Sequence, residues 1–330
     1  MAHEDSHQLL EEQQPAAPKV YAFVPSYNHA PFVESCLRSI IKQTLKPTEL
    51  LVIDDGSTDG SPQIIERVLE DCPFPCELIV RENRGLCATL NEGLARSCGD
   101  YFAYLGSDDL WLEGFLEART ALLESRPRAT LAYGHCYLID ERNRIVDCTN
   151  KWATYADGDA RKMLLQTTAP MSPTVVYRRN VLERHGWNEK ARLEDYDLYL
   201  RLCVEGEFAF DPQVLSAWRL HGRNTSWNQT MMLEEQLEAQ QRARETLGIS
   251  PEELEKLQTT IRFNRAEDFL RIGQKAKAFN LISHNLAGAN SPRRLARMLL
   301  RLLIPFRLIE WRKEILQRRT TEEYGSIEQG

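Results

Sequence analysis

The chain has 330 residues, of which 42% are hydrophobic and 27% are charged, and these ordinary proportions exclude a disordered, collagen-like or fibrous protein. The length predicts about two domains, at roughly 150 residues per domain. The net charge of -7 excludes a general nucleic-acid binder, because such a protein needs an excess of basic side chains to neutralise phosphates.

The first 18 residues are polar, acidic and rich in glutamine, and we expect a disordered tail over residues 1–18. They lack the basic start and the apolar stretch of a secretory signal. Nowhere does the sequence reach the roughly 20 consecutive apolar residues that span a bilayer. The eight scattered cysteines are best explained as reduced thiols, so the sequence predicts a cytoplasmic protein.

Strands and helices are predicted to alternate between residues 19 and 109. Short apolar runs predict strands at residues 19–25, 50–53, 77–80 and 101–105. Apolar residues at helical spacing predict the intervening helices at residues 32–41, 61–69 and 86–97. Ser61 before Pro62 predicts the N-cap of the second helix. Such alternation is typical of a mostly parallel sheet with helices on both faces.

The second half of the chain has a different mixture of elements. Strand-like runs lie at residues 132–139, 174–177 and 208–218, and a helix is expected at residues 193–204. From about residue 230 to 290 the pattern becomes helical, and Ser250 with Glu253 forms a capping box. The predicted fold class is therefore α/β, followed by a C-terminal helical region over residues 230–290.

Three predicted strands end in polar loops, at Ser26, Asp54 and Ser107. Because ligands of open α/β sheets bind beyond the carboxyl ends of the strands, these loops would meet in one crevice if the strands are neighbours. Asp54-Asp55 and Asp108-Asp109 offer carboxylates, which bind Mg²⁺ or Mn²⁺ together with substrate phosphates. Either loop alone is explained equally well as a polar turn, but two of them favour a metal and nucleotide site. The absence of a Gly-x-Gly-x-x-Gly or Walker A motif argues against a dinucleotide or P-loop site.

Several segments resemble, in order and spacing, the inverting family 2 glycosyltransferases of the GT-A fold. They are residues 24–28, 53–59, 83–85, 99–109, 193–198 and 218–226. The resemblance implies a GT-A domain with a Rossmann-like sheet over residues 19–229. It also implies transfer of a single sugar from a UDP-, GDP- or dTDP-linked donor, because the Gln-x-x-Arg-Trp motif and transmembrane helices of processive members are missing.

By this resemblance, Pro25, Tyr27 and Asp55 would hold the base and ribose of the nucleotide. Asn28 and Asp54 would lie beside them in the same nucleotide-sugar site. The resemblance therefore places the donor between the loops that follow the first two strands.

The acidic loop after the fourth strand resembles the metal-binding motif of the family. Asp108 would contact the nucleotide sugar, and Asp109 would bind a divalent cation, Mn²⁺ or Mg²⁺. His221 would be a further metal ligand, unless it is an ordinary structural histidine. Ser107 departs from the common Asp-x-Asp motif, so its hydroxyl or a water would replace one carboxylate. Arg84 would contact the sugar or the diphosphate.

Residues 193–198 resemble the acidic motif on the acceptor side, which implies Asp195 as the general base. Inverting transfer needs a carboxylate that takes the proton of the acceptor hydroxyl while its oxygen attacks the anomeric carbon. Glu194 and Asp197 are the alternatives, and at a helix N-terminus these acids also complement the helix dipole. We predict a catalytic site that contains Asp195 and Glu194.

The expected acceptor is a glycan or a polyprenyl-linked glycan, as in polysaccharide and O-antigen synthesis. The alternative function is a non-catalytic scaffold that binds a nucleotide sugar in a glycan assembly complex. Ser107 favours the scaffold because it replaces a carboxylate, whereas the Glu194-Asp195 pair favours an enzyme.

Charge is unevenly distributed along the chain. Residues 291–319 contain nine Lys and Arg and two Glu, a net charge of +7, so the rest of the chain carries -14. Apolar residues recur there at helical spacing, which predicts a basic amphipathic helix within residues 291–330, kinked at Pro305. Such a helix suits an anionic membrane surface, and we expect a peripheral protein at the inner face of the cytoplasmic membrane. Alternatively, its apolar stripe packs on the catalytic domain or on a second subunit.

Overall fold

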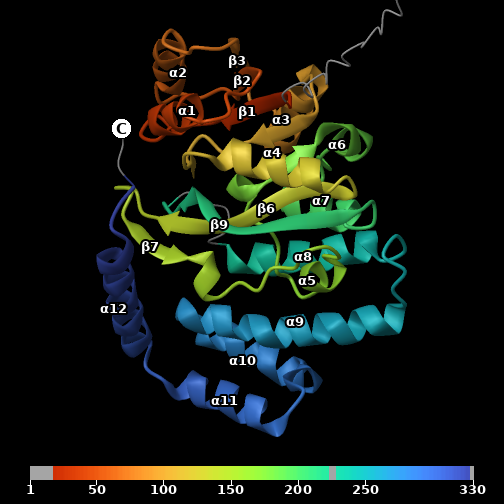
Figure 1. Cartoon of the computed structure of the whole chain (residues 1–330). Helices are drawn as coiled ribbons and strands as arrows, with labels where there is room; N and C mark the ends of the chain where they lie inside the picture. The colour runs from red at the N-terminus through yellow and green to blue at the C-terminus, as the bar shows by residue number, and fades with distance from the viewer. Residues whose placement is uncertain (1–17, 223–227, 328–330) are drawn as a thin grey trace, which may run out of the picture.

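The structure is a computed structural model that describes residues 18–222 and 228–327 (Figure 1). Residues 1–17 of the expected tail and residues 223–226 of the last motif lie outside the described residues. In the described part, the strands are β1 Val20–Ser26, β2 Glu49–Asp54, β3 Cys76–Val80, β4 Tyr101–Tyr104, β5 Leu110–Trp111, β6 Ala129–Ile139, β7 Ile145–Cys148, β8 Val176–Arg178 and β9 Glu207–Arg219. The helices are α1 Val33–Ile41, α2 Ser61–Leu69, α3 Leu86–Arg96, α4 Phe115–Ser125, α5 Arg161–Leu165, α6 Arg179–His185, α7 Glu194–Leu202, α8 Gln229–Ala243, α9 Pro251–Arg271, α10 Lys275–His284, α11 Pro292–Leu303 and α12 Phe306–Tyr324, with the short 3-10 turns η1 Thr149–Lys151, η2 Ser172–Thr174 and η4 Leu286–Ala289.

The first four strands form the parallel half of the sheet, as the alternation of strands and helices predicts. β1 lies between β2 and β4, and β2 pairs with β3, all in parallel. The register sets Ser26 beside Asp54 at the carboxyl ends of β1 and β2. The loops after these strands therefore leave the sheet at the same edge as the loop that follows β4.

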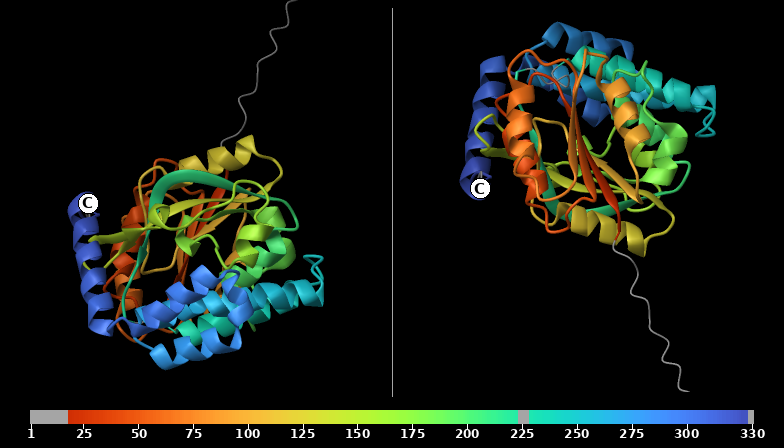
Figure 2. Two further views of the ribbon diagram at one scale, coloured as in Figure 1. Left: turned by 90° about the horizontal axis from the view of Figure 1, so that it is seen from below. Right: turned by 90° about the horizontal axis from the view of Figure 1, so that it is seen from above.

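Both faces of this parallel half are buried, because side chains alternate along each strand. From β1, Tyr21 and Phe23 enter a core shared with α3, α5, α6 and α7. Val20, Ala22 and Val24 enter the opposite core, shared with α1, α2 and α4. Figure 2 shows the strands running between these two groups of helices. The predicted layered α/β arrangement is confirmed.

Beyond β4 the sheet becomes mixed. β8 pairs antiparallel with both β4 and β6, and β6 pairs parallel with β9. β5 and β7 add antiparallel edges to β9 and β6. The sequence did not predict β5, β7 or α5, which have two, four and five residues and are too short for a periodic pattern. It also missed α4, because α4 buries Arg119 and Thr120 alongside its apolar side chains.

The helices expected at residues 230–290 are present, and Figure 1 shows them in layers below the sheet. The capping box is confirmed, since the Ser250 hydroxyl accepts a hydrogen bond from Glu253 N–H and Glu253 accepts one from Ser250 N–H. Ala239 and Ala243 of α8 belong to the same core as the side chains of β1 and α7. The C-terminal helical region therefore packs directly against the α/β region. None of the described helices is both long enough and apolar enough to cross a bilayer.

Two predictions about helix ends are wrong. Ser61 does not cap α2, because it is already the first helical residue and its hydroxyl donates to Asp59 at 2.6 Å. The basic tail is not one kinked helix, because α11 ends at Leu303 and α12 begins at Phe306. Pro305 lies between them, and a proline lacks the N–H that a continuous helix would need there.

Candidate active site

Asp54 ends β2 and builds the turn that follows it. Its Oδ1 accepts a hydrogen bond from the Ser57 N–H at 2.8 Å, and its Oδ2 accepts one from the Ser26 hydroxyl at 3.1 Å. The side chain is fully buried. The structure thus uses Asp54 to fix the loop, and its contact with a nucleotide stays a prediction.

Asp55 joins this loop to the segment after β3. Its carboxylate accepts hydrogen bonds from the backbone N–H groups of Arg84 at 2.9 Å and Gly85 at 2.8 Å. An ion pair with Arg81 completes its surroundings. The Arg84 side chain is exposed and pairs with Glu92 at 3.2 Å. Arg81 lies in no recognisable motif, so its role could not be predicted from the sequence.

A surface pocket of about 470 Å³ lies between the loops after β1 and β2 and is lined by Tyr27, Asn28, His29, Thr58 and Asp59. Asn28 fixes one wall, since its Oδ1 accepts the Thr58 N–H at 2.9 Å. Tyr27 is half exposed at the rim, whereas Pro25 is buried inside β1. An exposed aromatic ring beside polar groups suits the stacking of a planar base. The structure thus brings together Tyr27 and Asn28, but not Pro25, at this pocket.

His29, Asp108 and His221 form a cluster at the ends of β1, β4 and β9. His221 Nε2 lies 2.8 Å from Asp108 Oδ2, and His29 Nδ1 lies 3.7 Å from Asp108 Oδ1. One ligand atom of each residue lies within 4.8 Å of the others. His29 Nδ1 is also 2.8 Å from the Ser107 hydroxyl. Two imidazoles and a carboxylate fit a divalent ion such as Mn²⁺, so these residues suit the expected metal.

Opposing effects set the charge of Asp108. Burial raises the pKa of its carboxyl group, but the hydrogen bond from His221 and the nearby His29 outweigh burial, and the pKa lies below its usual value. Asp108 is therefore ionised at neutral pH. An ionised carboxylate is the form that binds a metal.

Asp109, the predicted direct metal ligand, lies deeper than Asp108. Its Oδ1 accepts the Arg219 N–H at 2.8 Å, and burial raises its pKa well above the usual value. The Arg219 guanidinium lies beneath the loop and donates to the carbonyl of Asp108 at 2.7 Å and to Asn143 Oδ1 at 2.6 Å. Among the described residues, Asp108 and not Asp109 is grouped with the histidines. Direct coordination by Asp109 stays a prediction.

Asp195 lies in the first turn of α7, where the sequence places the general base. The Tyr104 hydroxyl at the end of β4 donates a hydrogen bond to Asp195 Oδ1. Burial raises the pKa of Asp195 to about 6, while the bond from Tyr104 opposes this rise. A carboxylate with such a pKa is ionised at neutral pH and remains basic enough to take a proton. The contact of Tyr104 with Asp195 joins elements far apart in the chain, so it could not be predicted from the sequence.

The two alternatives to Asp195 lie in different surroundings. Burial, and next the charge of Asp195, raise the pKa of Glu194 to about 8, so Glu194 is largely protonated when Asp195 is ionised. Asp197 points into ion pairs with Arg201 at 3.1 Å and Arg242 at 2.9 Å. These ion pairs make Asp197 a structural acid and leave Asp195 and Glu194 as the candidates.

Residues 21–186 match the family model described as glycosyl transferase family 2. The chain belongs to this family. This family 2 glycosyltransferase is 27% identical to an uncharacterised glycosyltransferase of Nostoc over 170 residues, covering 50% of this chain and 52% of that protein. It is 28% identical to chondroitin synthase of Escherichia coli over 215 residues, covering 63% of this chain and 30% of that protein. The match spans about half of the first relative and less than a third of the second.

Solved structures share the fold of this family 2 glycosyltransferase. The mannosyltransferase PcManGT of Pyrobaculum calidifontis, in complex with GDP-Man and Mn²⁺, has a TM-score of 0.58 at 21% identity, covering 94% of this chain and 90% of its own. TarS 1–349 of S. aureus, in complex with UDP-GlcNAc, has a TM-score of 0.57 at 16% identity, covering 93% and 91%. At these identities the likeness shows the fold alone, which is the expected GT-A fold.

Proposed function

We propose that the chain is an inverting, metal-dependent glycosyltransferase that moves one sugar from a nucleotide sugar to a glycan or a lipid-linked glycan. The observation that carries this proposal is the position of β4. Its Tyr104 bonds to the candidate base Asp195, and Asp108, just beyond its end, lies with His29 and His221. One strand thus supports both the acceptor side and the diphosphate side of a transfer.

In the proposed reaction, Asp195 takes the proton of the acceptor hydroxyl while its oxygen bonds to the anomeric carbon of the donor. The bond from that carbon to the diphosphate oxygen breaks, and the nucleoside diphosphate leaves with the bonding electrons. Attack from the opposite face inverts the anomeric configuration. A divalent cation held by Asp108, His29 and His221 would supply positive charge to the leaving diphosphate. Tyr104 orients Asp195 by holding its Oδ1.

The donor is proposed to be a UDP-, GDP- or dTDP-sugar bound in the pocket beside Tyr27 and Asn28. Two proteins of the same fold bind GDP-Man and UDP-GlcNAc, which supports this class of donor. The cation is proposed to be Mn²⁺ or Mg²⁺, and the two imidazoles favour Mn²⁺. The Mn²⁺ bound to the mannosyltransferase also supports this assignment.

The acceptor is proposed to be a growing polysaccharide or a polyprenyl-linked glycan of the O-antigen type. One relative is named chondroitin synthase, which supports a polysaccharide product. A lipid-linked acceptor would place the enzyme at the cytoplasmic membrane, with its active site on the inner side. Peripheral attachment there is the proposed location.

Nucleotide release from a panel of nucleotide sugars tests the proposal. We expect one donor to be turned over with Mn²⁺ and not with EDTA, and Asp195→Asn to reduce kcat by about a thousandfold, because the base is lost while donor binding remains. Glu189→Gln is the matched control, since Glu189 is an exposed acid before the same helix. NMR of the product should show the anomeric configuration opposite to that of the donor.

A scaffold would give a different pattern in the same experiment. It would bind a nucleotide sugar, seen as a rise in Tm, without releasing nucleotide. Release that is equal in the wild type and in Asp195→Asn would overturn Asp195 as the base. Release that persists in EDTA would overturn metal dependence.

A further inference from the structure

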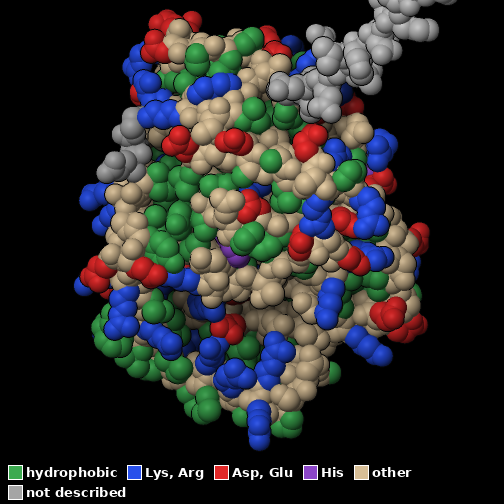
Figure 3. Space-filling view, in the orientation of Figure 1, with side chains coloured by type: hydrophobic (Ala, Val, Ile, Leu, Met, Phe, Trp, Pro, Cys, Tyr) green, Lys and Arg blue, Asp and Glu red, His purple; other side chains and the backbone are tan. Residues whose placement is uncertain are grey.

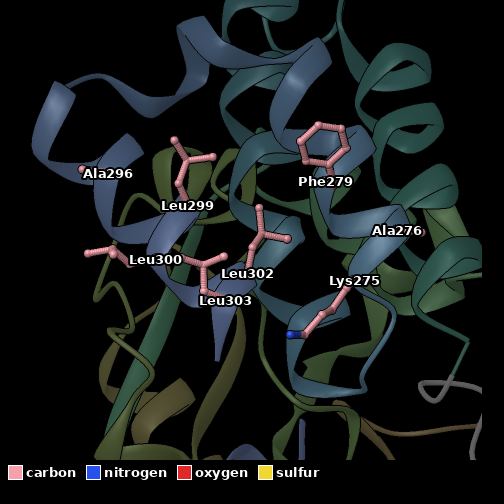
Figure 4. Close-up of a pocket in the computed structure, with 8 residues that line it drawn as sticks. All are labelled: Lys275, Ala276, Phe279, Ala296, Leu299, Leu300, Leu302 and Leu303. Carbon is pink, nitrogen blue, oxygen red and sulfur yellow. The ribbon is translucent and has the colours of Figure 1, made fainter. Parts of the chain in front are cut away.

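α10 and α11 enclose an open apolar hollow on the surface. Its volume is about 820 Å³, and most of its lining comes from Ala276, Phe279, Leu299, Leu300, Leu302 and Leu303. Figure 4 shows these side chains around the hollow, with the ammonium group of Lys275 at its edge. Phe279 is 58% exposed, Leu300 64% and Leu303 76%. A concentration of exposed apolar side chains like this one is typical of a surface that binds another protein or a membrane.

The exposed leucines are not the ones that hold α11 on the protein. Met298 is buried in the core of the helical region, and Leu295 and Leu302 pack against the same core. Leu299, Leu300 and Leu303 remain exposed, and Leu300 and Leu303 are the most exposed of the three. Packing of the tail on the rest of the chain therefore accounts for one side of α11 and leaves the other side uncovered.

α12, the next helix, also exposes apolar side chains. Leu308 and Trp311, three residues apart on one side of α12, are more than half exposed, whereas Thr320 and Tyr324, four residues apart, face β7 and the hairpin beside it. Tryptophan is enriched where a membrane meets water, because its ring is apolar and its N–H is polar. Both tail helices thus pack partly against the protein and still expose apolar side chains.

Exposed basic side chains lie on the same two helices as these apolar side chains. Arg293 and Arg297 of α11 and Arg307, Arg312, Arg318 and Arg319 of α12 are exposed. Residues 291–319 carry a net charge of +7 on a chain whose remainder carries -14. Figure 3 shows Lys and Arg side chains gathered over the lower part of the molecule, with hydrophobic side chains along its lower left edge. An apolar centre with a basic border complements the acyl region and the negative headgroups of an anionic leaflet.

We propose that the α10–α11 hollow and the exposed side of α12 dock on the surface of an anionic lipid bilayer. Leu299, Leu300, Leu303 and Phe279 enter the boundary between headgroups and acyl chains, and the arginines contact lipid phosphates. This docking does not require the transferase reaction, so the two proposals can fail separately. It names the part of the chain that would bring the active site to a lipid-linked acceptor.

Flotation of the full-length protein with vesicles tests the docking. We expect the protein to float with phosphatidylcholine vesicles that contain phosphatidylglycerol, to float less at high salt, and to stay in solution with phosphatidylcholine alone. Leu300→Glu with Leu303→Glu should weaken binding by about tenfold or more, because each change sets a charge against the acyl region. Leu286→Glu is the matched control, since Leu286 is an exposed leucine of η4 outside the hollow.

The same two proteins also test whether a second copy of the chain, and not a bilayer, covers this surface. Sedimentation velocity of both proteins reports whether the double variant turns a dimer into a monomer. A dimer that the variant breaks, with vesicle binding absent or unchanged, would assign the surface to a second copy and overturn the proposal. Equal flotation of wild type and double variant would also overturn it. Release of nucleotide from soluble donor should be the same in both proteins, which separates loss of docking from loss of fold.

Discussion

Tyr104 sets the protonation of the candidate base. Its hydroxyl donates to Asp195 Oδ1 and favours the ionised carboxylate, so it opposes the burial that raises the pKa of Asp195 to about 6. Tyr104→Phe removes this bond and keeps the ring, which packs against Trp187 and Tyr177. Without this bond the pKa of Asp195 rises, so we expect the acidic limb of the pH profile of kcat/KM to move upward by about one pH unit. Below the midpoint of the wild-type profile, kcat/KM should fall about tenfold. At alkaline pH the variant should approach the wild type.

Tyr133→Phe is the control for this prediction. Tyr133 is buried in the same core, and its hydroxyl bonds to the Ala156 carbonyl, away from Asp195. It should keep the wild-type pH profile even if it lowers Tm. Glu194, Cys87 and Tyr199 also face Asp195 and are unchanged in both variants, so they cannot produce the difference. Equal profiles for wild type and Tyr104→Phe would show that the hydroxyl does not tune the base.

At the level of single residues, the sequence predicted the acids and one of their partners, His221, but not the other partners. Asp54, Asp55, Asp108 and Asp195 follow strands or begin a helix, and such positions are readable from an apolar run and its polar end. His29, Arg81 and Tyr104 act through contacts across the sheet that the pairing of strands creates. Their hydrogen-bond partners are 26, 78 and 91 residues away for Arg81, His29 and Tyr104, and no local pattern marks such a distance.

The hairpin of β6 and β7 supports the acidic loop from below. Asn143 sits in its turn with a positive φ of 61°, and its Oδ1 accepts a bond from the buried Arg219. Arg219 in turn donates to the Asp108 carbonyl, so the turn positions the loop through one guanidinium group. Asn143→Ala should weaken Mn²⁺ binding by about tenfold and lower stability by about 1 to 3 kcal/mol, because a buried donor loses its acceptor. Calorimetric Mn²⁺ titration and thermal unfolding measure the two effects.

Asn290→Ala separates the site effect from backbone strain. Asn290 also has a positive φ, 55°, but it is exposed at the end of η4, away from the acidic loop. It should lose stability from strain alone, less than Asn143→Ala loses, and bind Mn²⁺ like the wild type. If both variants keep wild-type affinity for Mn²⁺, the turn does not position the loop.

At the level of elements, the sequence predicted the strands and helices whose own residues form a recognisable pattern. β1, β2, α2 and α9 combine an apolar run or stripe with a proline, glycine or cap at the end, so local physics marks them. β5 and β7 exist because β9 and β6 offer free edges to pair with. The break at Pro305 shows the same limit, since the sequence showed a proline but not whether the helix would bend or end there.

At the scale of the molecule, the sheet and the helical region are joined by an ionic network in which two buried carboxylates pair with two partly exposed arginines. Arg242 of α8 donates to Glu235 at 2.6 Å and to Asp197 of α7 at 2.9 Å, and Glu235 also accepts from Arg192 at 3.0 Å. Glu235 is 1% exposed and Asp197 is 5% exposed. Removing one arginine leaves buried carboxylates with fewer partners, which costs more free energy than the loss of a surface ion pair.

Arg242→Met should therefore lower the free energy of unfolding by about 2 to 3 kcal/mol at neutral pH. Burial raises the pKa of Glu235, but Arg242 and Arg192 outweigh it and hold the pKa below the usual value. The stabilisation is thus present above the ordinary carboxyl pKa and is lost as pH falls through the lowered one, so the two proteins should converge in acid. Arg244→Met is the control, because Arg244 pairs with the exposed Glu245 and should cost less than about 1 kcal/mol.

Hydrogen exchange shows whether this network makes the two regions one cooperative unit. α8 contributes Ala239 and Ala243 to the core that also holds Phe23 of β1, so loosening α8 exposes the sheet as well as the helices. In Arg242→Met, the slowest amides of α9 and of β1 should therefore exchange faster by the same factor. Faster exchange in α9 alone would mean that residues 230–290 unfold independently of the sheet. The domain boundary expected near residue 229 would then separate two cooperative units. Equal acceleration would mean that the boundary divides the sequence but not the folded core.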